Sequence, residues 1–393
     1  MFIGRSIEEK IKYLGTKFPV ITLTGIRQCG KSTLLRRCFP EYRYVSLEDL
    51  DIRQLVKDDP RGFLQNFGSK IIIDEAQYAP HLFSYIQTIV DKKNESGMYI
   101  LSGSQNFLLM DAISQSLAGR TAILRLSTFS ITELKKQNKL PELNDWLFTG
   151  GFPRIYDKAI LPVDFFPHYM QTYIERDVRS LRNINNLSLF IRFIKLCAAR
   201  TGQILNLNSL ANQADITVNT AKSWLSILES SYVIYLLKPY YKNFNKRLIK
   251  SPKLYFHDTG LICALLNLSN KEQLSTHYLR GEIFENMVIN EFIKNKLAEG
   301  KVPELYFWRD SNHNEIDLLF EQNGNIHAAE IKSAATLNSR FLIALKHFQT
   351  ISQINKQNLY VVYGGDMDYQ TSDGTFISWK HTHKLCEYIN NND

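Results

Sequence analysis

The residues that decide the fold read Gly25-Ile26-Arg27-Gln28-Cys29-Gly30-Lys31-Ser32. They match the pattern Gly-x-x-x-x-Gly-Lys-Ser/Thr, in which the glycines let the backbone turn its N–H groups onto phosphates. The apolar run Val20–Thr24 precedes the motif, and a helical pattern, Ser32–Cys38, follows it. The N-terminus of such a helix adds partial positive charge beside the loop. The sequence therefore predicts a strand, a phosphate-binding loop and a helix, in that order.

The residues of this loop have distinct predicted roles. Lys31 would reach the β- and γ-phosphates, and the Ser32 hydroxyl would ligate Mg²⁺. Cys29 is interpreted as a small filler inside the loop. The predicted nucleotide-binding residues are Gly25, Ile26, Arg27, Gln28, Cys29, Gly30, Lys31, Ser32 and Thr33.

A second apolar strand ends in two adjacent carboxylates. The run Lys70–Ile73 leads directly into Asp74 and Glu75. An acid at this place suits the magnesium shell, which assigns Asp74 to the metal and leaves Glu75 to activate the attacking water. Ser104 and Gln105 follow another apolar strand, so either could touch the γ-phosphate as a sensor. Capping of a turn is the alternative role for both.

The composition is that of a globular protein from a reducing compartment. Of the 393 residues, 44% are hydrophobic and 22% are charged, which excludes a disordered chain and favours roughly two to three domains. The five cysteines form no Cys-x-x-Cys pair, so neither a disulfide framework nor a cysteine zinc site is expected. No signal-peptide pattern opens the sequence, and no apolar run approaches roughly 20 residues. We therefore expect a cytoplasmic protein with no membrane partner.

Four regions of the chain differ in their pattern of apolar and polar residues. Residues 1–135 alternate short apolar runs with helical stretches, which predicts an α/β domain with a parallel sheet covered on both faces. Residues 141–200 read as a helical lid, 201–260 as a winged-helix-like module and 277–393 as a small α/β domain. The strands predicted in the first region are Val20–Thr24, Tyr42–Leu47, Lys70–Asp74, Met98–Ser102 and Ala122–Leu126.

Several motifs together resemble the AAA+ ATPases, in particular a bacterial and archaeal group whose C-terminal part is a domain of unknown function. The motifs are Gly25–Ser32, Ile71–Gln77, Leu101–Gln105 and Leu117–Arg120, joined downstream by Gly151–Pro153, Tyr173–Asp177 and Phe256–Gly260. The resemblance implies a module that uses ATP and Mg²⁺ and can act as a homo-oligomer. It further implies that an arginine from a neighbouring copy completes the site, with Arg120 and Arg176 as candidates. A structural ion pair is the alternative for each arginine.

Residues 207–230 have the residue pattern of a helix-turn-helix. The expected helices are Leu207–Ala214 and Thr217–Ser230, followed by a hairpin of Tyr232–Leu237 and Lys253–His257. In a winged helix the second helix enters the major groove of DNA, and the net charge of +8 permits such contact. Contact with another protein is the alternative. The candidate DNA contacts are Thr217, Asn219, Thr220, Lys222 and Ser223 on the helix and Lys242, Lys246, Arg247, Lys250 and Lys253 around the wing.

The last region resembles the PD-(D/E)xK nuclease superfamily through Asp317 and the triplet Glu330-Ile331-Lys332. Period-two alternation places Glu330 and Lys332 on one face of a strand. The resemblance implies a second divalent metal, Mg²⁺ or Mn²⁺, between Asp317 and Glu330, with Lys332 beside the phosphate. Glu285 on a preceding helix could supply a further carboxylate. A degenerate nuclease fold used for binding or stability is the alternative.

Two functional hypotheses follow. The first is a Mg²⁺-dependent ATPase that acts on DNA and cleaves it with the second metal. The second is a nucleotide-gated regulatory or protein-remodelling ATPase whose nuclease-like domain is inert.

Overall fold

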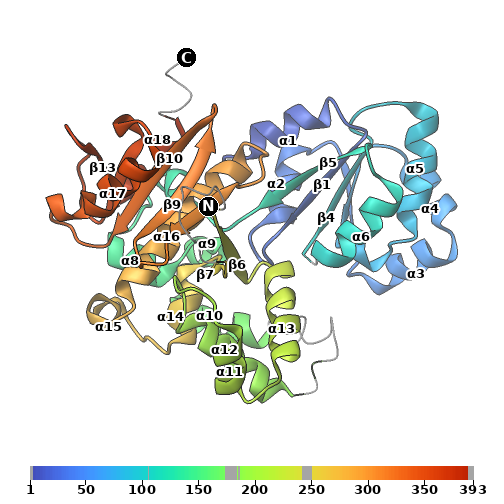
Figure 1. Cartoon of the computed structure of the whole chain (residues 1–393). Helices are drawn as coiled ribbons and strands as arrows, with labels where there is room; N and C mark the ends of the chain where they lie inside the picture. The colour runs from blue at the N-terminus through green and yellow to red at the C-terminus, as the bar shows by residue number, and fades with distance from the viewer. Residues whose placement is uncertain (1–2, 105, 173–183, 185, 241–249, 388–393) are drawn as a thin grey trace. The chain divides into compact units, whose positions relative to one another are not determined.

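The computed structural model describes all residues except 1–2, 105, 173–183, 185, 241–249 and 388–393. Contacts divide the chain into two compact units (Figure 1). The first comprises Met1–Phe129, Ser230–Tyr232 and Lys296–Val302, and the second comprises Ser130–Glu229, Val233–Asn295 and Pro303–Asp393. The predicted lid and most of both the winged-helix-like module and the C-terminal region therefore fall within one unit. Within the described residues, we find no helix that is long and apolar enough to cross a membrane.

The first unit contains a five-stranded sheet in which every pair of neighbouring strands is parallel. Its strands are β1 (Val20–Gly25), β2 (Arg43–Ser46), β3 (Ile71–Asp74), β4 (Tyr99–Gly103) and β5 (Thr121–Leu126), in the order β2-β3-β4-β1-β5. All five predicted strands are confirmed. Strands β1, β3 and β4 are buried along their whole length, which explains their nearly continuous apolar sequences.

Helices cover the sheet of the first unit, as expected for an α/β fold of the P-loop type (Figure 1). Asp49 and Asp59 begin two of them by accepting hydrogen bonds from backbone N–H groups of the first turn. The helices are α1 (Glu8–Gly15), α2 (Lys31–Cys38), α3 (Leu50–Asp58), α4 (Pro60–Phe67), α5 (Leu82–Lys93) and α6 (Asn106–Ser116), with a 3₁₀ turn, η1 (Ala76–Tyr78).

Two short pieces from much later in the sequence complete the first unit. The Tyr232 hydroxyl lies 3.1 Å from the Thr24 hydroxyl, and the Arg125 guanidinium lies 4.7 Å from the centre of the Tyr232 ring. Gly300 has a φ of +72°, and a Cβ added there would lie 2.9 Å from Cε of Lys10. The later pieces are therefore closely packed parts of the unit.

The second unit begins with a series of helices. Ser130 and Glu133 form a capping box at the start of the first helix, and Phe152 packs against Phe165, Phe166 and Tyr169. Of the predicted helical lid, residues 173–183 and 185 lie outside the described residues. The helices are α7 (Ile131–Lys135), α8 (Leu143–Thr149), α9 (Pro153–Lys158), α10 (Pro162–Tyr169), α11 (Leu187–Ala198), α12 (Leu207–Ala214), α13 (Val218–Ser230), α14 (Thr259–Leu265) and α15 (Lys271–Thr276).

A mixed eight-stranded sheet forms the rest of the second unit, in the order β12-β13-β11-β10-β9-β8-β6-β7. The strands are β6 (Ile234–Pro239), β7 (Lys253–Phe256), β8 (Leu305–Arg309), β9 (Glu315–Gln322), β10 (Asn325–Lys332), β11 (Leu359–Tyr363), β12 (Tyr369–Thr371) and β13 (Gly374–Ser378). Helices α16 (Arg280–Ala298), α17 (Ile343–Ser352) and α18 (Thr382–Glu387) accompany them.

The predicted hairpin is present, but it does not stand alone. Strands β6 and β7 pair antiparallel, and β6 also pairs in parallel with β8 through Lys238 with Tyr306 and Pro239 with Phe307. An open strand edge offers unpaired backbone groups, and β8 satisfies those of β6. The ranges 201–260 and 277–393, expected to be separate, therefore share one sheet.

Candidate functional site

The phosphate-loop motif joins β1 to α2 as predicted, and its glycines adopt conformations that other residues rarely reach. Gly25 has a φ of +142°, and Gly30 has a φ of +92°. A Cβ added at Gly25 would lie 2.0 Å from the carbonyl oxygen of Leu126 on β5. The loop can therefore pass this close to the neighbouring strand only because residue 25 is glycine.

The side chain of Lys31 folds back onto the start of the phosphate loop. Its side chain is buried, and Nζ donates hydrogen bonds of 3.1 Å to the carbonyl oxygens of both Gly25 and Ile26. The ammonium therefore lies at the loop itself, where phosphates would bind. Cys29 is also buried, and burial raises the pKa of its thiol, which fits its interpretation as a filler.

A buried arginine, Arg5, stabilises the phosphate loop through a hydrogen bond to its backbone. Arg5 donates to the carbonyl oxygens of Cys29 at 2.8 Å and Ser127 at 2.6 Å, and its guanidinium lies 5.0 Å from the centre of the Phe129 ring. These contacts tie the segment before α1 to the phosphate loop and to the residues after β5. The sequence does not point to this residue, because a lone arginine before a helix carries no recognisable pattern.

Asp74 is the centre of a cage of hydroxyl groups. It is 5% exposed, and it accepts hydrogen bonds from Ser32 Oγ at 2.5 Å, from the Tyr44 hydroxyl at 2.6 Å and from the Ser102 hydroxyl. Ser32 and Asp74, the two predicted magnesium residues, are therefore in direct contact. Hydroxyl and carboxylate oxygens are hard donors of the kind that Mg²⁺ prefers, so these residues fit that ion.

Glu75 takes an unusual backbone conformation next to this cage. Its φ of +52° lies in the left-handed region. Its Oε2 accepts hydrogen bonds from Gln77 Nε2, from Ser104 Oγ at 3.2 Å and from the Ser104 backbone N–H at 3.4 Å. Ser104, a predicted sensor, thus contacts the predicted base, while Gln105 lies outside the described residues.

Three further groups near Asp74 and Glu75 are not predicted from the sequence: Tyr44, Gln77 and Ser102. Tyr44 is 36% exposed, and the Arg36 guanidinium lies 5.1 Å from the centre of its ring. Partial burial and the adjacent Asp74 raise the pKa of Tyr44 to about 12. Because β2 and β4 both neighbour β3, polar residues near the ends of these strands could have signalled such contacts, but only once the strand order was known.

Arg120 lies at the opposite end of the strands from the phosphate loop. Its carbonyl oxygen accepts from the Val20 N–H at the start of β1, whereas the phosphate loop follows the end of that strand. Its guanidinium pairs with Asp91 on α5 through contacts of 2.5 and 2.9 Å. The ion pair given as its structural alternative is therefore present, and a role in a neighbouring copy's site stays a prediction. Arg176 lies outside the described residues.

The helix pair α12–α13 presents the predicted polar face. Thr217, Asn219 and Lys222 are exposed, and Thr220 and Ser223 are partly exposed. Trp224, on the opposite face, packs edge-on against Phe190 and Phe193 of α11 with ring centres 5.1 and 5.4 Å apart. Of the basic residues predicted around the wing, Lys250 is exposed and Lys253 is buried, while Lys242, Lys246 and Arg247 lie outside the described residues.

The four predicted nuclease residues converge in the second unit. Lys332 Nζ lies 3.3 Å from Asp317 and 2.6 Å from Glu330, which confirms that Glu330 and Lys332 share a face. Glu285 on α16 is reached by Lys253 Nζ at 2.9 Å and by the Tyr255 hydroxyl at 2.5 Å. Burial raises the pKa of Glu285 to about 7 and that of Glu330 to about 8.

This convergence does not support the predicted second metal. Across the described part of the chain, no group of three histidine, cysteine, aspartate or glutamate side chains is placed to hold a metal ion. The carboxylates of the cluster are instead bonded to lysines, among them Lys253, which the sequence predicts on the wing. Lys253 and Glu315 are further members of this cluster that the sequence does not predict.

Two of the motifs that carried the family resemblance meet in the second unit. Asp258 accepts from the Gly151 N–H at 2.8 Å and from Leu261 N–H at 3.3 Å, so it caps α14 and fixes the glycine turn. A Cβ on Gly150 would lie 2.1 Å from Asp258 Oδ1. Asp258 therefore has a structural role as a helix cap.

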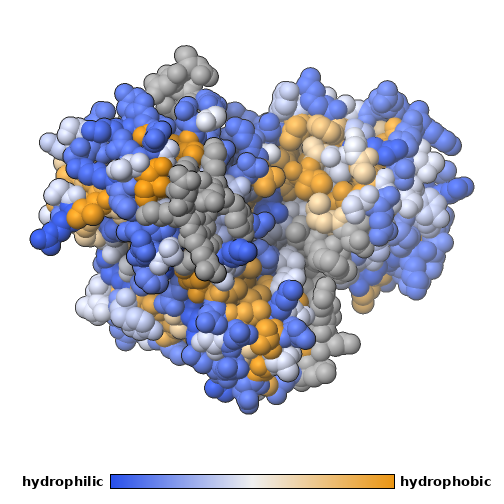
Figure 2. Space-filling model, viewed as in Figure 1, coloured by the Kyte–Doolittle hydropathy of each residue, from blue (hydrophilic) through white to orange (hydrophobic). Residues whose placement is uncertain are grey.

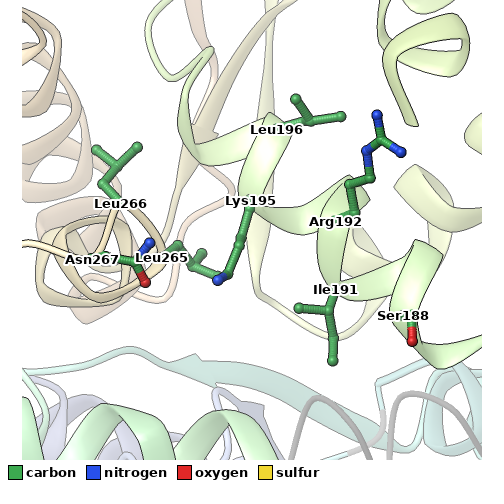
Figure 3. Close-up of a pocket in the computed structure, with 8 residues that line it drawn as sticks. All are labelled: Ser188, Ile191, Arg192, Lys195, Leu196, Leu265, Leu266 and Asn267. Atoms are coloured by element: carbon green, nitrogen blue, oxygen red, sulfur yellow. The ribbon is translucent and has the colours of Figure 1, made fainter. Parts of the chain in front are cut away.

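A shallow pocket opens between α11 and the end of α14 (Figure 3). Lys195 extends toward Asn267, and Ile191, Leu196 and Leu265 provide apolar walls. Hydrophobic residues also reach the surface among the helices of this unit (Figure 2). The residues that line the pocket include none of the predicted site residues.

Three family models match successive parts of the chain. An AAA domain matches residues 17–135, a domain of unknown function (DUF8612) matches 140–272, and a second one (DUF4143) matches 280–382. The AAA match covers the phosphate loop, Asp74, Glu75 and Ser104.

The chain is also similar to individual proteins. The uncharacterised proteins Rv2008c of Mycobacterium tuberculosis and Mb2031c of Mycobacterium bovis are each 30% identical to it over 367 residues, or 90% of this chain and 78% of theirs. Among solved structures, the Walker-type ATPase PABY2304 of Pyrococcus abyssi is 15% identical with a TM-score of 0.47, and the match covers 67% of this chain and 96% of that one.

Proposed function

We propose that this chain, which belongs to the same family as Rv2008c and Mb2031c and carries an AAA-type P-loop ATPase domain in residues 17–135, hydrolyses ATP with Mg²⁺. The observation that carries the proposal is the direct contact of Ser32 with Asp74 beside a phosphate loop built on Gly25 and Gly30. The reaction would take place at the carboxyl edge of the five-stranded sheet, because all of these residues lie there.

The loop residues would bind the phosphates of ATP. Lys31 would exchange its hydrogen bonds to the Gly25 and Ile26 carbonyls for the β- and γ-phosphates, where charge-assisted bonds are stronger. Ser32 and Asp74 would hold Mg²⁺, which when bound neutralises charge on the phosphates. Arg5 would keep the loop in place during this exchange, because it donates to the backbone carbonyl of Cys29.

Glu75 would accept the proton of the attacking water. Gln77 and Ser104 both donate to the same oxygen, Oε2, so they orient the carboxylate and leave Oε1 as the oxygen that faces water in this mechanism. Ser104 would thereby link the base to the γ-phosphate.

Two variants separate binding from hydrolysis. Lys31→Ala should abolish tight ATP binding, because the phosphates lose a charged partner. Glu75→Gln should keep ATP bound and slow turnover, because an amide cannot act as a base. Fluorescent-nucleotide binding and phosphate release should be measured for both, with Glu48→Gln, an exposed glutamate of the same unit, as the control. An equal loss of ATP affinity in Lys31→Ala and Glu75→Gln would contradict the role given to Glu75.

DNA is the partner we propose for the second unit. The exposed Thr217, Asn219 and Lys222 on α13 support this, since hydroxyl, amide and ammonium groups contact phosphates and base edges. The apolar face around Trp224 holds the helix firmly on α11. Contact with another protein through the same face is the alternative, and DNA binding by Lys222 variants distinguishes the two.

We further propose that the chain acts as a homo-oligomer, with Arg120 contributing to a neighbouring copy's ATP site. Its distance from the phosphate loop of its own chain supports a role between copies. DNA cleavage is not included in the proposed function, because Glu285, Asp317 and Glu330 are already bonded to lysines. The nucleotide-gated regulatory hypothesis therefore describes the second unit better than the nuclease hypothesis.

A further inference from the structure

The carboxylate cluster of the second unit surrounds a buried ammonium group. Lys253 opens β7, and its side chain is only 3% exposed. Its Nζ lies 2.9 Å from Glu285 Oε1, 2.5 Å from Glu315 Oε1 and 3.9 Å from Asp317 Oδ1. These carboxylates come from α16 and β9, so residues distant in the sequence converge on one cation.

The other members of the cluster form a second layer around this cation. The remaining oxygen of Glu315 pairs with Arg309 at 2.9 Å, and the remaining oxygen of Asp317 accepts from the Ile331 N–H at 2.8 Å. The Tyr255 hydroxyl donates to the same Glu285 oxygen as Lys253 does. Each carboxylate that touches Lys253 is thus held in place by another donor, as the ligands of a bound ion are.

We propose that the Lys253 ammonium is the resident cation of this cluster and stands where a divalent metal would otherwise be held. A buried carboxylate needs a cation or a proton, and Lys253 supplies that charge from within the chain. A divalent ion among the same oxygens would lie within a few ångströms of the ammonium, and the two positive charges would repel each other. The native second unit therefore requires no metal.

Removal of the ammonium should turn the cluster into a metal site. Glu285, Glu315 and Asp317 are not placed to hold a metal in the native arrangement, where the ammonium lies among them. Without the ammonium these three carboxylates would be able to move together around Mg²⁺ or Mn²⁺, which bind oxygen ligands of this kind. Glu330 adds a further group, since its side chain is 6% exposed and its Oε1 has no hydrogen-bond partner within the described residues. Lys253 is then the residue that decides between an inert and a metal-binding cluster.

The experiment uses the full chain and Mn²⁺ alone, without nucleotide. The four tryptophans, Trp146, Trp224, Trp308 and Trp379, all lie in the second unit, so tryptophan fluorescence reports its thermal unfolding separately from that of the ATPase unit. Lys253→Ala should lower the Tm in the absence of metal, and Mn²⁺ should raise it again by several degrees, because a ligand that binds only the folded state stabilises it. The wild type should show no such rise.

Three further variants make the test specific. Lys253→Ala combined with Asp317→Asn should lose the response to Mn²⁺, because a ligand is missing. Lys271→Ala removes an exposed lysine that pairs with Asp145 at 2.8 Å in the same unit, and it should behave like the wild type. Lys253→Met keeps the packing of the stem without the charge, so it reports on the loss of charge if the alanine variant does not fold.

Either of two results would overturn the inference. One is a wild-type chain whose Tm rises with Mn²⁺ and whose response is abolished by Asp317→Asn, because the metal would then bind beside Lys253. The other is a folded Lys253→Ala chain that gains no response to Mn²⁺. A Lys253→Ala chain that folds only when Mn²⁺ is added supports the inference.

Discussion

Replacement of Tyr44 by phenylalanine isolates one hydrogen bond at the proposed magnesium site. The Tyr44 hydroxyl donates to Asp74 Oδ2 at 2.6 Å, and the Arg36 guanidinium contacts the ring, not the hydroxyl. Tyr44→Phe therefore removes one of the hydroxyl donors that orient the carboxylate, while the Ser32 and Ser102 hydroxyls and the packing of the ring remain.

The size of the effect follows from the charge and exposure of the two groups. A hydrogen bond to a charged group contributes about 1.5–3 kcal/mol, and the 36% exposure of Tyr44 lets water replace part of it. We therefore take the lower end, about 1.5 kcal/mol, which corresponds to roughly a tenfold change in an equilibrium constant. Because Asp74 would hold the metal, the loss should appear in the affinity for Mg²⁺.

The assay is ATP hydrolysis measured over a range of Mg²⁺ concentrations at saturating ATP. For Tyr44→Phe the half-saturating Mg²⁺ concentration should rise by about five- to tenfold, while kcat at saturating Mg²⁺ should stay within about twofold of the wild type. Tyr42→Phe is the matched control, because the Tyr42 hydroxyl donates to the Gly97 carbonyl at 2.5 Å and does not touch Asp74. An unchanged half-saturating concentration, or an equal rise in Tyr42→Phe, would refute the reasoning.

Two further predictions concern the second unit. Lys222→Ala should weaken binding to duplex DNA and lower the salt dependence by about one unit of slope, measured by fluorescence anisotropy at several salt concentrations; an unchanged slope would favour a protein partner for α13. The free energy of unfolding of this unit should fall as pH rises from about 5 to about 8. Glu330 has a pKa of about 8 in the folded chain and an ordinary pKa of 4.5 in the unfolded chain, so between these values the folded state binds the proton more tightly. Glu330→Gln should flatten that dependence in urea unfolding followed by tryptophan fluorescence, and parallel profiles for the two proteins would contradict the burial argument.

The first unit was largely predictable because its signals are local. The five strands are short apolar runs, and the loop motif lies within eight consecutive residues, so neither requires knowledge of distant contacts. Asp74 and Glu75 were identified for the same reason, since they directly follow an apolar run. Tyr44 and Gln77 were missed because their roles depend on which strands and turns lie side by side.

The second unit shows the limit of reasoning from position in the sequence. Lys253 was counted as a phosphate contact of an exposed wing because basic residues precede it. In the structure it is buried among carboxylates of α16 and β9, and only the tertiary fold brings these groups together. The nuclease-like residues did converge as the resemblance implied, but the triplet Glu330-Ile331-Lys332 could not reveal that a second lysine occupies their centre.

The order in which the ATPase unit acquires its parts has a consequence for its biosynthesis. Phe129 ends the long first segment, yet Tyr232 contacts Thr24 and Gly300 packs on Lys10. A ribosome that adds about 5–20 residues per second needs roughly 9–35 s to travel from Phe129 to Val302. During that interval the nascent ATPase unit lacks one or both of its last two pieces, so it is completed only after most of the second unit has been made. Expression of residues 1–129 alone would reproduce this unfinished intermediate.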